Sequence, residues 1–167
     1  KEPVGVGGPG MKVCVLGLWH LGSVTAACLA SVGHEVTGLD PNSGIVEKLR
    51  KAEPPVSEPG LDDLIREGIN AGQLKFTSDA KIAISSAEVL WVTYDTPVDK
   101  NDQADVEFVF EEVLKLLSFL SIYTTVLVSS QLPVGSIKRF EVVAAEKYPE
   151  KKLRFAYSPE NLRLGKS

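Results

Sequence analysis

The sequence is poor in the features that would mark a secreted, metal-binding or membrane-spanning protein. Only two of its 167 residues are cysteines, Cys14 and Cys28, and their spacing fits neither a metal site nor a disulfide framework. No apolar run approaches the roughly 20 residues that span a bilayer, and residues 1–10 lack the apolar core of a secretory signal. We therefore expect no metal site, no membrane partner and a cytoplasmic location.

Positive charge is also scarce, since 18 Lys and Arg stand against 22 Asp and Glu, for a net charge of −4. Such a chain has no overall electrostatic attraction for a phosphodiester backbone, so we expect no nucleic acid partner.

Cys14 and Cys28 both lie in apolar stretches, and we interpret both as small core residues. Met11, the single methionine, directly precedes the first apolar run. We expect residues 1–10 to be a flexible leader added to the native chain.

From Met11 onward, short apolar runs of β type alternate with longer segments of helical periodicity. The predicted strands span 12–17, 34–40, 74–78, 88–94, 124–130 and 153–157. The predicted helices span 20–32, 42–51, 60–71, 79–86, 105–120 and 136–147, and their candidate capping residues are Asn42, Ser43, Asp79 and Ser136. This alternation predicts an α/β fold, a doubly wound, Rossmann-type, mostly parallel sheet of about six strands with helices on both faces. We expect this domain to cover residues 11–157.

The first predicted strand runs through the glycine-rich turn GLWHLG, residues 17–22, into a helix, and the second predicted strand ends in Asp40. This order is typical of dinucleotide sites. Gly17 allows the tight turn, Gly22 allows close helix packing, and the helix N-terminus attracts a pyrophosphate. Asp40 is expected to accept hydrogen bonds from the adenosine ribose. The predicted cofactor-binding residues in this part are Gly17, Leu18, Trp19, His20, Leu21, Gly22 and Asp40.

Two details refine the predicted cofactor site. No arginine follows Asp40 closely enough to neutralise a 2′-phosphate, so the sequence favours NAD over NADP. Trp19 stands where the fingerprint usually has its middle glycine, and a large indole there either swings away or crowds the phosphates. His20 is first interpreted as a helix-start residue, because the motif contains no carboxylate partner for it.

Four segments carry motifs: 58–79 (EPGLDDLIREGINAGQLKFTSD), 94–99 (YDTPVD), 129–136 (SSQLPVGS) and 157–165 (YSPENLRLG). These motifs resemble those of the UDP-glucose/GDP-mannose dehydrogenase family. Together with the glycine turn they are distributed along the chain from residue 17 to residue 165. The resemblance implies an enzyme that oxidises the C6 alcohol of a nucleotide sugar, UDP- or GDP-linked, to a carboxylate in two NAD-dependent steps. It also implies a homo-oligomer. In the family a catalytic cysteine, lysine, asparagine and aspartate come from segments that would lie beyond Ser167. We therefore expect this chain alone to show no turnover.

The same resemblance assigns roles to individual residues. Tyr94, Thr96, Pro97 and Ser130 are implied to contact the cofactor. Glu160 matches a glutamate that assists proton transfer or water activation, and Gln131 replaces a threonine that helps to hold the hydrolytic water. Asn161, Leu162 and Arg163 are implied to lie along the nucleotide sugar.

Two other functions remain open on the sequence. One is a nucleotide-sensing or scaffolding Rossmann module whose pyrophosphate site is altered by Trp19. The other is a methyl-donor-dependent transferase, which can also carry an acidic residue after its second strand, although the segments 58–79 and 157–165 argue against it. The sequence does not rank UDP-glucose, UDP-N-acetylmannosamine and GDP-mannose as substrates.

Overall fold

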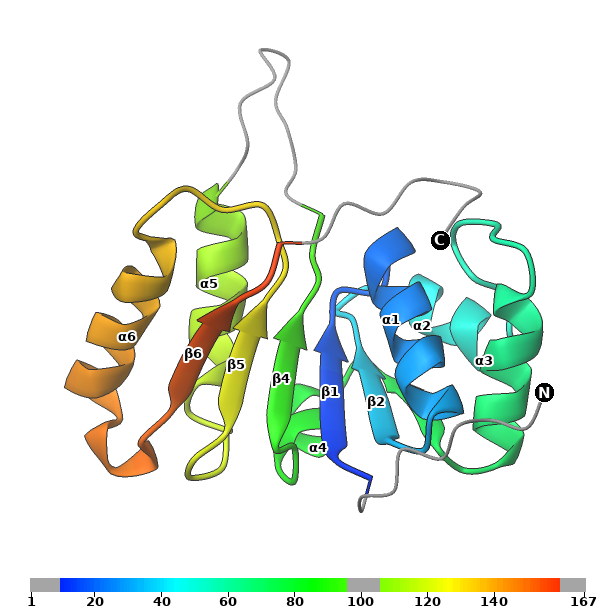
Figure 1. Cartoon of the computed structure of the whole chain (residues 1–167), viewed down its shortest axis with the longest axis horizontal. Coiled ribbons are helices and arrows are strands. Elements are labelled where there is room, and N and C mark those ends of the chain that lie inside the picture. The colour runs from blue at the N-terminus through cyan, green and yellow to red at the C-terminus, as the bar shows by residue number, and fades with distance from the viewer. Residues whose placement is uncertain (1–9, 96–105, 160–167) are drawn as a thin grey trace, which may run out of the picture.

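The computed structural model describes residues 10–95 and 106–159, which contain a six-stranded sheet, as Figure 1 shows. Every neighbouring pair of strands is parallel, and the strand order is β3-β2-β1-β4-β5-β6. This order is that of a doubly wound dinucleotide-binding sheet. The strands are β1 (Lys12–Leu16), β2 (Glu35–Leu39), β3 (Leu74–Thr77), β4 (Val89–Val92), β5 (Thr125–Val128) and β6 (Arg154–Tyr157).

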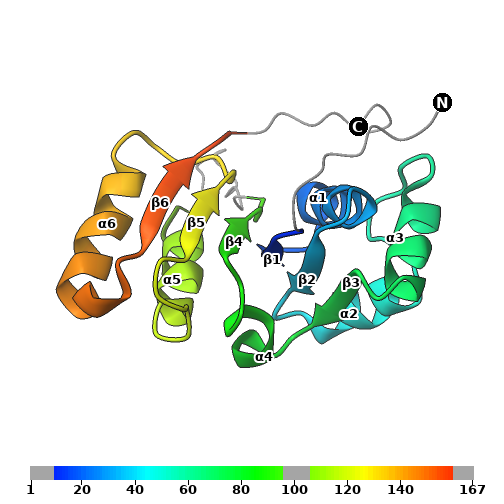
Figure 2. The same cartoon turned by 60° about the horizontal axis from the view of Figure 1, so that its bottom comes forward.

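The helices divide between the two faces of the sheet. The first three, α1 (His20–Ser31), α2 (Ser43–Arg50) and α3 (Leu61–Asn70), share one apolar cluster with side chains of β1 and β2. The other three, α4 (Ala80–Ile84), α5 (Val106–Leu116) and α6 (Ser136–Lys147), share a second cluster on the opposite face. Figure 2 shows α1 and α5 on opposite sides of the strands. A 3₁₀ turn, η1 (Pro149–Lys151), precedes β6.

Alternation along β1 explains how one short strand serves both clusters. Val13 and Val15 belong to the cluster under α1, whereas Cys14 and Leu16 belong to the cluster under α5. Successive side chains of a strand point to opposite faces, and a strand covered on both faces is therefore apolar throughout. The near-continuous apolar character of this segment is thus a consequence of its central place in the sheet.

The predicted fold class is confirmed, with element ends that differ by a few residues from the predicted ones. The predicted caps Asn42 and Asp79 are confirmed, since their side chains accept hydrogen bonds from the first turns of α2 and α4. Ser136 was wrong as a cap, because α6 is capped by Gly135 in the left-handed conformation. The prediction of a core Cys28 was also wrong, because that side chain lies on the exposed face of α1.

None of the helices in residues 10–95 and 106–159 has the length and apolar character that crossing a bilayer requires.

Candidate cofactor-binding site

The candidate site lies at the carboxyl-terminal edge of the sheet, where β1 and β4 are neighbours. The chain leaves β1 toward α1 on one face and leaves β4 toward the other face, so the strand order reverses there. In open parallel sheets ligands bind at this kind of switch point. Leu16 is in register with Leu39 of β2 and with Val92 of β4. The residues that follow these three strands therefore meet at one edge (Figure 1).

The turn between β1 and α1 requires glycine at two positions. Gly17 has a φ of +91°, a left-handed conformation that costs other residues energy. A Cβ added at Gly17 would also lie 2.7 Å from Cδ1 of Tyr94. At Gly22, an added Cβ would lie 1.7 Å from the carbonyl oxygen of Gly17, so α1 could not pack this closely on its own turn. Both predicted glycine roles thus have a direct steric reason.

Thr93, directly after β4, fixes the same turn from the neighbouring strand. Its buried hydroxyl donates to the carbonyl oxygens of Leu16 and Gly17, at 3.0 and 2.7 Å. Its backbone N–H donates to the Leu16 carbonyl at 2.8 Å. The sequence reasoning missed this residue, since its partners lie more than seventy residues away.

Asp40, directly after β2, is held by two backbone donors. Its Oδ2 accepts from the N–H of Leu18 at 2.8 Å, and its Oδ1 accepts from the N–H of Asn42 at 2.8 Å. The residue is only 6% exposed. A carboxylate has about four acceptor positions, so each oxygen retains capacity for one further donor. A ribose, which presents two neighbouring hydroxyl groups, matches that capacity.

The start of α1 presents its free amide groups beside Asp40. The first N–H groups of a helix have no carbonyl partner within the helix and attract anions. Leu18 is fully buried and its N–H is already bonded to Asp40, whereas Leu21 is half-buried within the first turn of α1. Trp19 caps the helix without a side-chain hydrogen bond, and its indole is 49% exposed. The indole therefore does not pack in the core.

His20 has a carboxylate partner that the motif alone did not reveal. Its Nε2 lies 2.7 Å from Oε1 of Glu58, and both side chains are buried. This hydrogen bond joins the start of α1 to the loop that precedes α3. Burial raises the pKa of Asp95, and His20 opposes part of this rise. The contact gives His20 a structural role in holding the loop beside the site.

Among residues 10–95 and 106–159, two buried hydroxyl groups at this edge have no hydrogen-bond partner: Oη of Tyr94 and Oγ of Ser130. Burial, with smaller contributions from Glu112, Asp40 and Cys14, raises the pKa of Tyr94, so its hydroxyl stays protonated and can donate. Buried polar groups normally have partners. Two unpartnered hydroxyl groups that follow β4 and β5 are thus consistent with a polar ligand at this edge.

Comparison with known proteins assigns the chain to a family. Residues 11–167 match the model of the NAD binding domain of the UDP-glucose/GDP-mannose dehydrogenase family. The chain belongs to this family. Within it, the chain is 32% identical over 156 residues to UDP-glucose 6-dehydrogenase of Rhizobium meliloti, which covers 93% of this chain and 36% of that protein. It is 32% identical over 161 residues to GDP-mannose 6-dehydrogenase of Pseudomonas putida, covering 92% of this chain and 36% of that protein.

Solved structures of the family share the fold. A ternary complex of GDP-mannose dehydrogenase from Pseudomonas aeruginosa has a TM-score of 0.84 and 28% identity, and the match covers 93% of this chain and 37% of that one. UDP-glucose dehydrogenase from the archaeon Pyrobaculum islandicum has a TM-score of 0.84 and 30% identity, with 95% and 38% covered. This chain thus spans little more than a third of the family members it matches.

NAD is the cofactor of the matched domain, and the described residues fit it. The glycine turn leaves no room for a Cβ, the Asp40 carboxylate retains acceptor capacity, and Tyr94 and Ser130 offer unpartnered hydroxyl groups. Gln131 is exposed directly after Ser130. The predicted residues Thr96, Pro97, Glu160, Asn161, Leu162 and Arg163 lie outside the described residues.

Proposed function

We propose that this chain is the cofactor-binding part of a nucleotide-sugar 6-dehydrogenase. The proposed reaction converts the C6 alcohol of a UDP- or GDP-linked sugar into a carboxylate. It consumes two NAD⁺ and one water and releases two NADH and three protons. The observation that carries the proposal is the Asp40 carboxylate, fixed by two backbone N–H groups beside a turn that admits only glycine at positions 17 and 22. Family membership supports it, as do relatives named UDP-glucose and GDP-mannose 6-dehydrogenase.

Each described residue has a defined part in holding the cofactor. Asp40 accepts hydrogen bonds from the adenosine ribose hydroxyl groups, and the amide groups at the start of α1 face the pyrophosphate. The hydroxyl groups of Tyr94 and Ser130 donate to the cofactor and thereby gain the partners that they lack. When bound, NAD supplies a nicotinamide ring that accepts hydride from the sugar.

The same geometry favours NAD over NADP. The buried Asp40 carboxylate is fixed at both oxygens and cannot turn away from a 2′-phosphate, so the two negative charges would repel each other. Lys48 lines a pocket next to Asn42, but a cation there does not displace the carboxylate that both backbone N–H groups hold in place. We therefore expect weaker binding of NADP than of NAD.

The remaining assignments extend the proposal to the catalytic reaction. A glutamate near the reacting carbon can move a proton during oxidation or hydrolysis, and an amide side chain can hold a water molecule. The proposed roles are cofactor contact for Thr96 and Pro97, proton transfer for Glu160, water binding for Gln131, and sugar-nucleotide contact for Asn161, Leu162 and Arg163. The other catalytic groups come from a further part of the protein, which acts as a homo-oligomer, so the 167-residue chain alone is inactive.

Calorimetric titration tests the cofactor part of the proposal. The 167-residue chain is titrated with NAD and NADP, and Asp40→Ala serves as the comparison. We expect NAD to bind more tightly than NADP, and Asp40→Ala to abolish the difference. A wild-type chain that binds neither dinucleotide would instead favour a scaffold module without its ligand.

A second experiment tests the reaction. The gene product that contains this chain is supplied with NAD and, in separate assays, with UDP-glucose, UDP-N-acetylmannosamine or GDP-mannose. We expect two NADH per sugar with at least one of them and none from the 167-residue chain. NADH formation by the chain alone would contradict the proposed division of the active site.

A further inference from the structure

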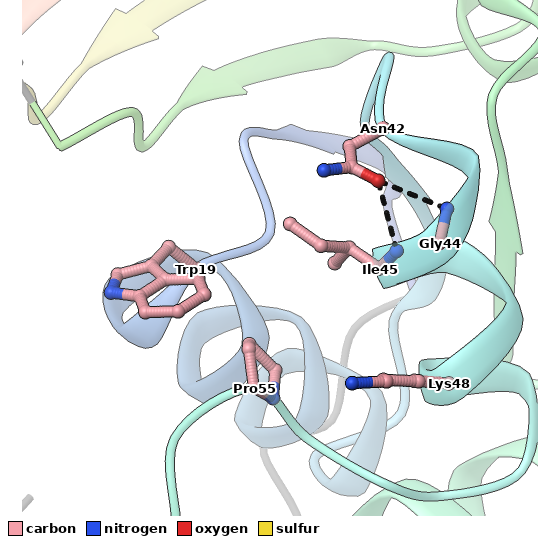
Figure 3. Close-up of a pocket in the computed structure, with 6 residues that line it drawn as sticks. All are labelled: Trp19, Asn42, Gly44, Ile45, Lys48 and Pro55. Carbon is pink, nitrogen blue, oxygen red and sulfur yellow. Dashed lines mark hydrogen bonds between the residues drawn. The ribbon is translucent and has the colours of Figure 1, made fainter.

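A pocket of about 290 Å³ opens between the start of α1, the first turns of α2 and the loop before α3. Its lining residues are Trp19, Asn42, Gly44, Ile45, Lys48 and Pro55 (Figure 3). We propose that Trp19 is an adenine-stacking residue, whose indole forms one wall of a pocket for the adenine of NAD. The inference rests on the proposed function and adds a binding role for a residue that stands in place of a glycine.

The position of Trp19 shows that the fold does not require its side chain. The indole is 49% exposed and belongs to neither apolar cluster. The residue caps α1 only through its backbone, since its carbonyl accepts from the N–H of Ser23 at 3.1 Å. Exposure of a large aromatic surface at the edge of a pocket is a feature of binding sites.

The pocket lies beside the expected position of the ribose. Asn42, which lines the pocket, donates its backbone N–H to Oδ1 of Asp40. Adenine is attached directly to the ribose, so a ribose bound at Asp40 places the base next to Asn42. The pocket and the carboxylate are thus adjacent parts of one adenosine site.

The chemistry of the walls suits a flat heterocycle with acceptor atoms at its edge. The indole of Trp19, Ile45 and Pro55 offer apolar surface, and Figure 3 shows the indole across the pocket from Ile45. Asn42 uses its side-chain oxygen to cap α2, which leaves its amide N–H groups as donors. Lys48 adds a second donor. Ring nitrogens of adenine accept hydrogen bonds, so donors at the rim match the base.

Stacking and crowding predict opposite effects of removing the indole. If the indole stacks on adenine, Trp19→Ala weakens binding of an adenosine ligand. If the indole obstructs the pyrophosphate, the same variant strengthens binding. Trp19→Phe keeps an aromatic face in a smaller ring. Because the side chain lies outside the core, neither variant should unfold the chain.

The test titrates ADP-ribose into the 167-residue chain by calorimetry. We expect Trp19→Ala to weaken binding about tenfold, which corresponds to about 1.4 kcal/mol and lies in the range for one base–aromatic stack. Trp19→Phe should stay within about threefold of the wild type. Unchanged or tighter binding by Trp19→Ala would overturn the stacking role. If Asp40→Ala weakened ADP-ribose binding in that case, the proposed function would survive without the stacking role.

Indole fluorescence gives an independent measurement, since the chain has two tryptophans. Trp91 packs under α1 and donates from Nε1 to Oγ of Ser129 at 2.9 Å, apart from the pocket. We expect ADP-ribose to quench fluorescence in the Trp91→Phe chain, where Trp19 is the remaining indole, and not in the Trp19→Phe chain. The reverse pattern would overturn the proposal. Absence of ADP-ribose and NAD binding in the wild-type chain would overturn both it and the proposed function.

Discussion

Replacing Asp40 with asparagine changes one atom of a side chain that accepts at both ends. In the structure, Oδ2 accepts from the N–H of Leu18 and Oδ1 from the N–H of Asn42, both at 2.8 Å. An asparagine has one acceptor oxygen, so its NH₂ group must face one of these two donors. The Asp40→Asn variant therefore loses one buried hydrogen bond of the fold and one acceptor for the ribose.

The lost hydrogen bond of the fold and the lost ribose acceptor have comparable free energies, and each is measured by its own experiment. A hydrogen bond to a charged group contributes about 1.5–3 kcal/mol, so we expect denaturant unfolding to show a decrease in free energy of about that size. Loss of one ribose acceptor should weaken NAD binding about 10- to 100-fold in calorimetry under conditions where the variant is folded. NADP binding should weaken less, because the neutral amide no longer repels its 2′-phosphate.

Asp79→Asn is the matched control. Asp79 caps α4 by accepting from the N–H of Ile82 at 3.1 Å, and asparagine is an equally good cap. We expect this control to leave NAD affinity unchanged. NAD affinity of Asp40→Asn within twofold of the wild type would refute the assigned role of the carboxylate. Equal losses for NAD and NADP would refute the explanation of cofactor preference.

Three further variants test other parts of the account. Tyr94→Phe removes a buried hydroxyl that has no partner among the described residues. The free energy of unfolding should stay the same or rise by up to about 1 kcal/mol, while NAD affinity falls about three- to tenfold. A clear loss of stability with no change in NAD affinity would argue against a ligand contact. Gly22→Ala should prevent folding, measured by circular dichroism, because its Cβ would lie 1.7 Å from the Gly17 carbonyl oxygen; a folded variant with native stability would contradict the packing described. The hydrogen bonds from Arg139 lower the pKa of Glu107, so the pair stabilises the fold above the ordinary glutamate pKa, and this contribution is lost as the pH falls through the lowered pKa. Glu107→Gln should accordingly lower Tm at neutral pH and not in acid, and an equal difference at both pH values would exclude the ion pair as its cause.

The sequence predicted the parts of the fold and site that depend on local pattern. Apolar strands covered on both faces, helix caps such as Asn42 and Asp79, and a glycine turn before a helix are all recognisable within a few neighbouring residues. Asp40 could be assigned because parallel strands end at one edge, which brings their following residues together. Cys28 was misplaced because apolar neighbours do not determine which face of a helix a residue occupies.

Contacts between distant segments could not be predicted in this way. The His20–Glu58 hydrogen bond joins residues 38 positions apart, and Thr93 reaches Gly17 across 76 positions. The sequence left two options for Trp19, and the structure sets its indole among the residues that line the pocket beside α2. The sequence does not indicate whether the hydroxyl of a serine or threonine forms a hydrogen bond. The unpartnered hydroxyl of Ser130 could therefore be identified only in the folded chain.

A crystal structure of the 167-residue chain with NAD bound tests the central claim most directly. The account predicts the adenosine ribose within hydrogen-bonding distance of both Asp40 oxygens, while the N–H groups of Leu18 and Asn42 keep their present bonds. A dinucleotide bound elsewhere on the chain, with the edge beyond β1 and β2 unchanged and empty, would contradict it.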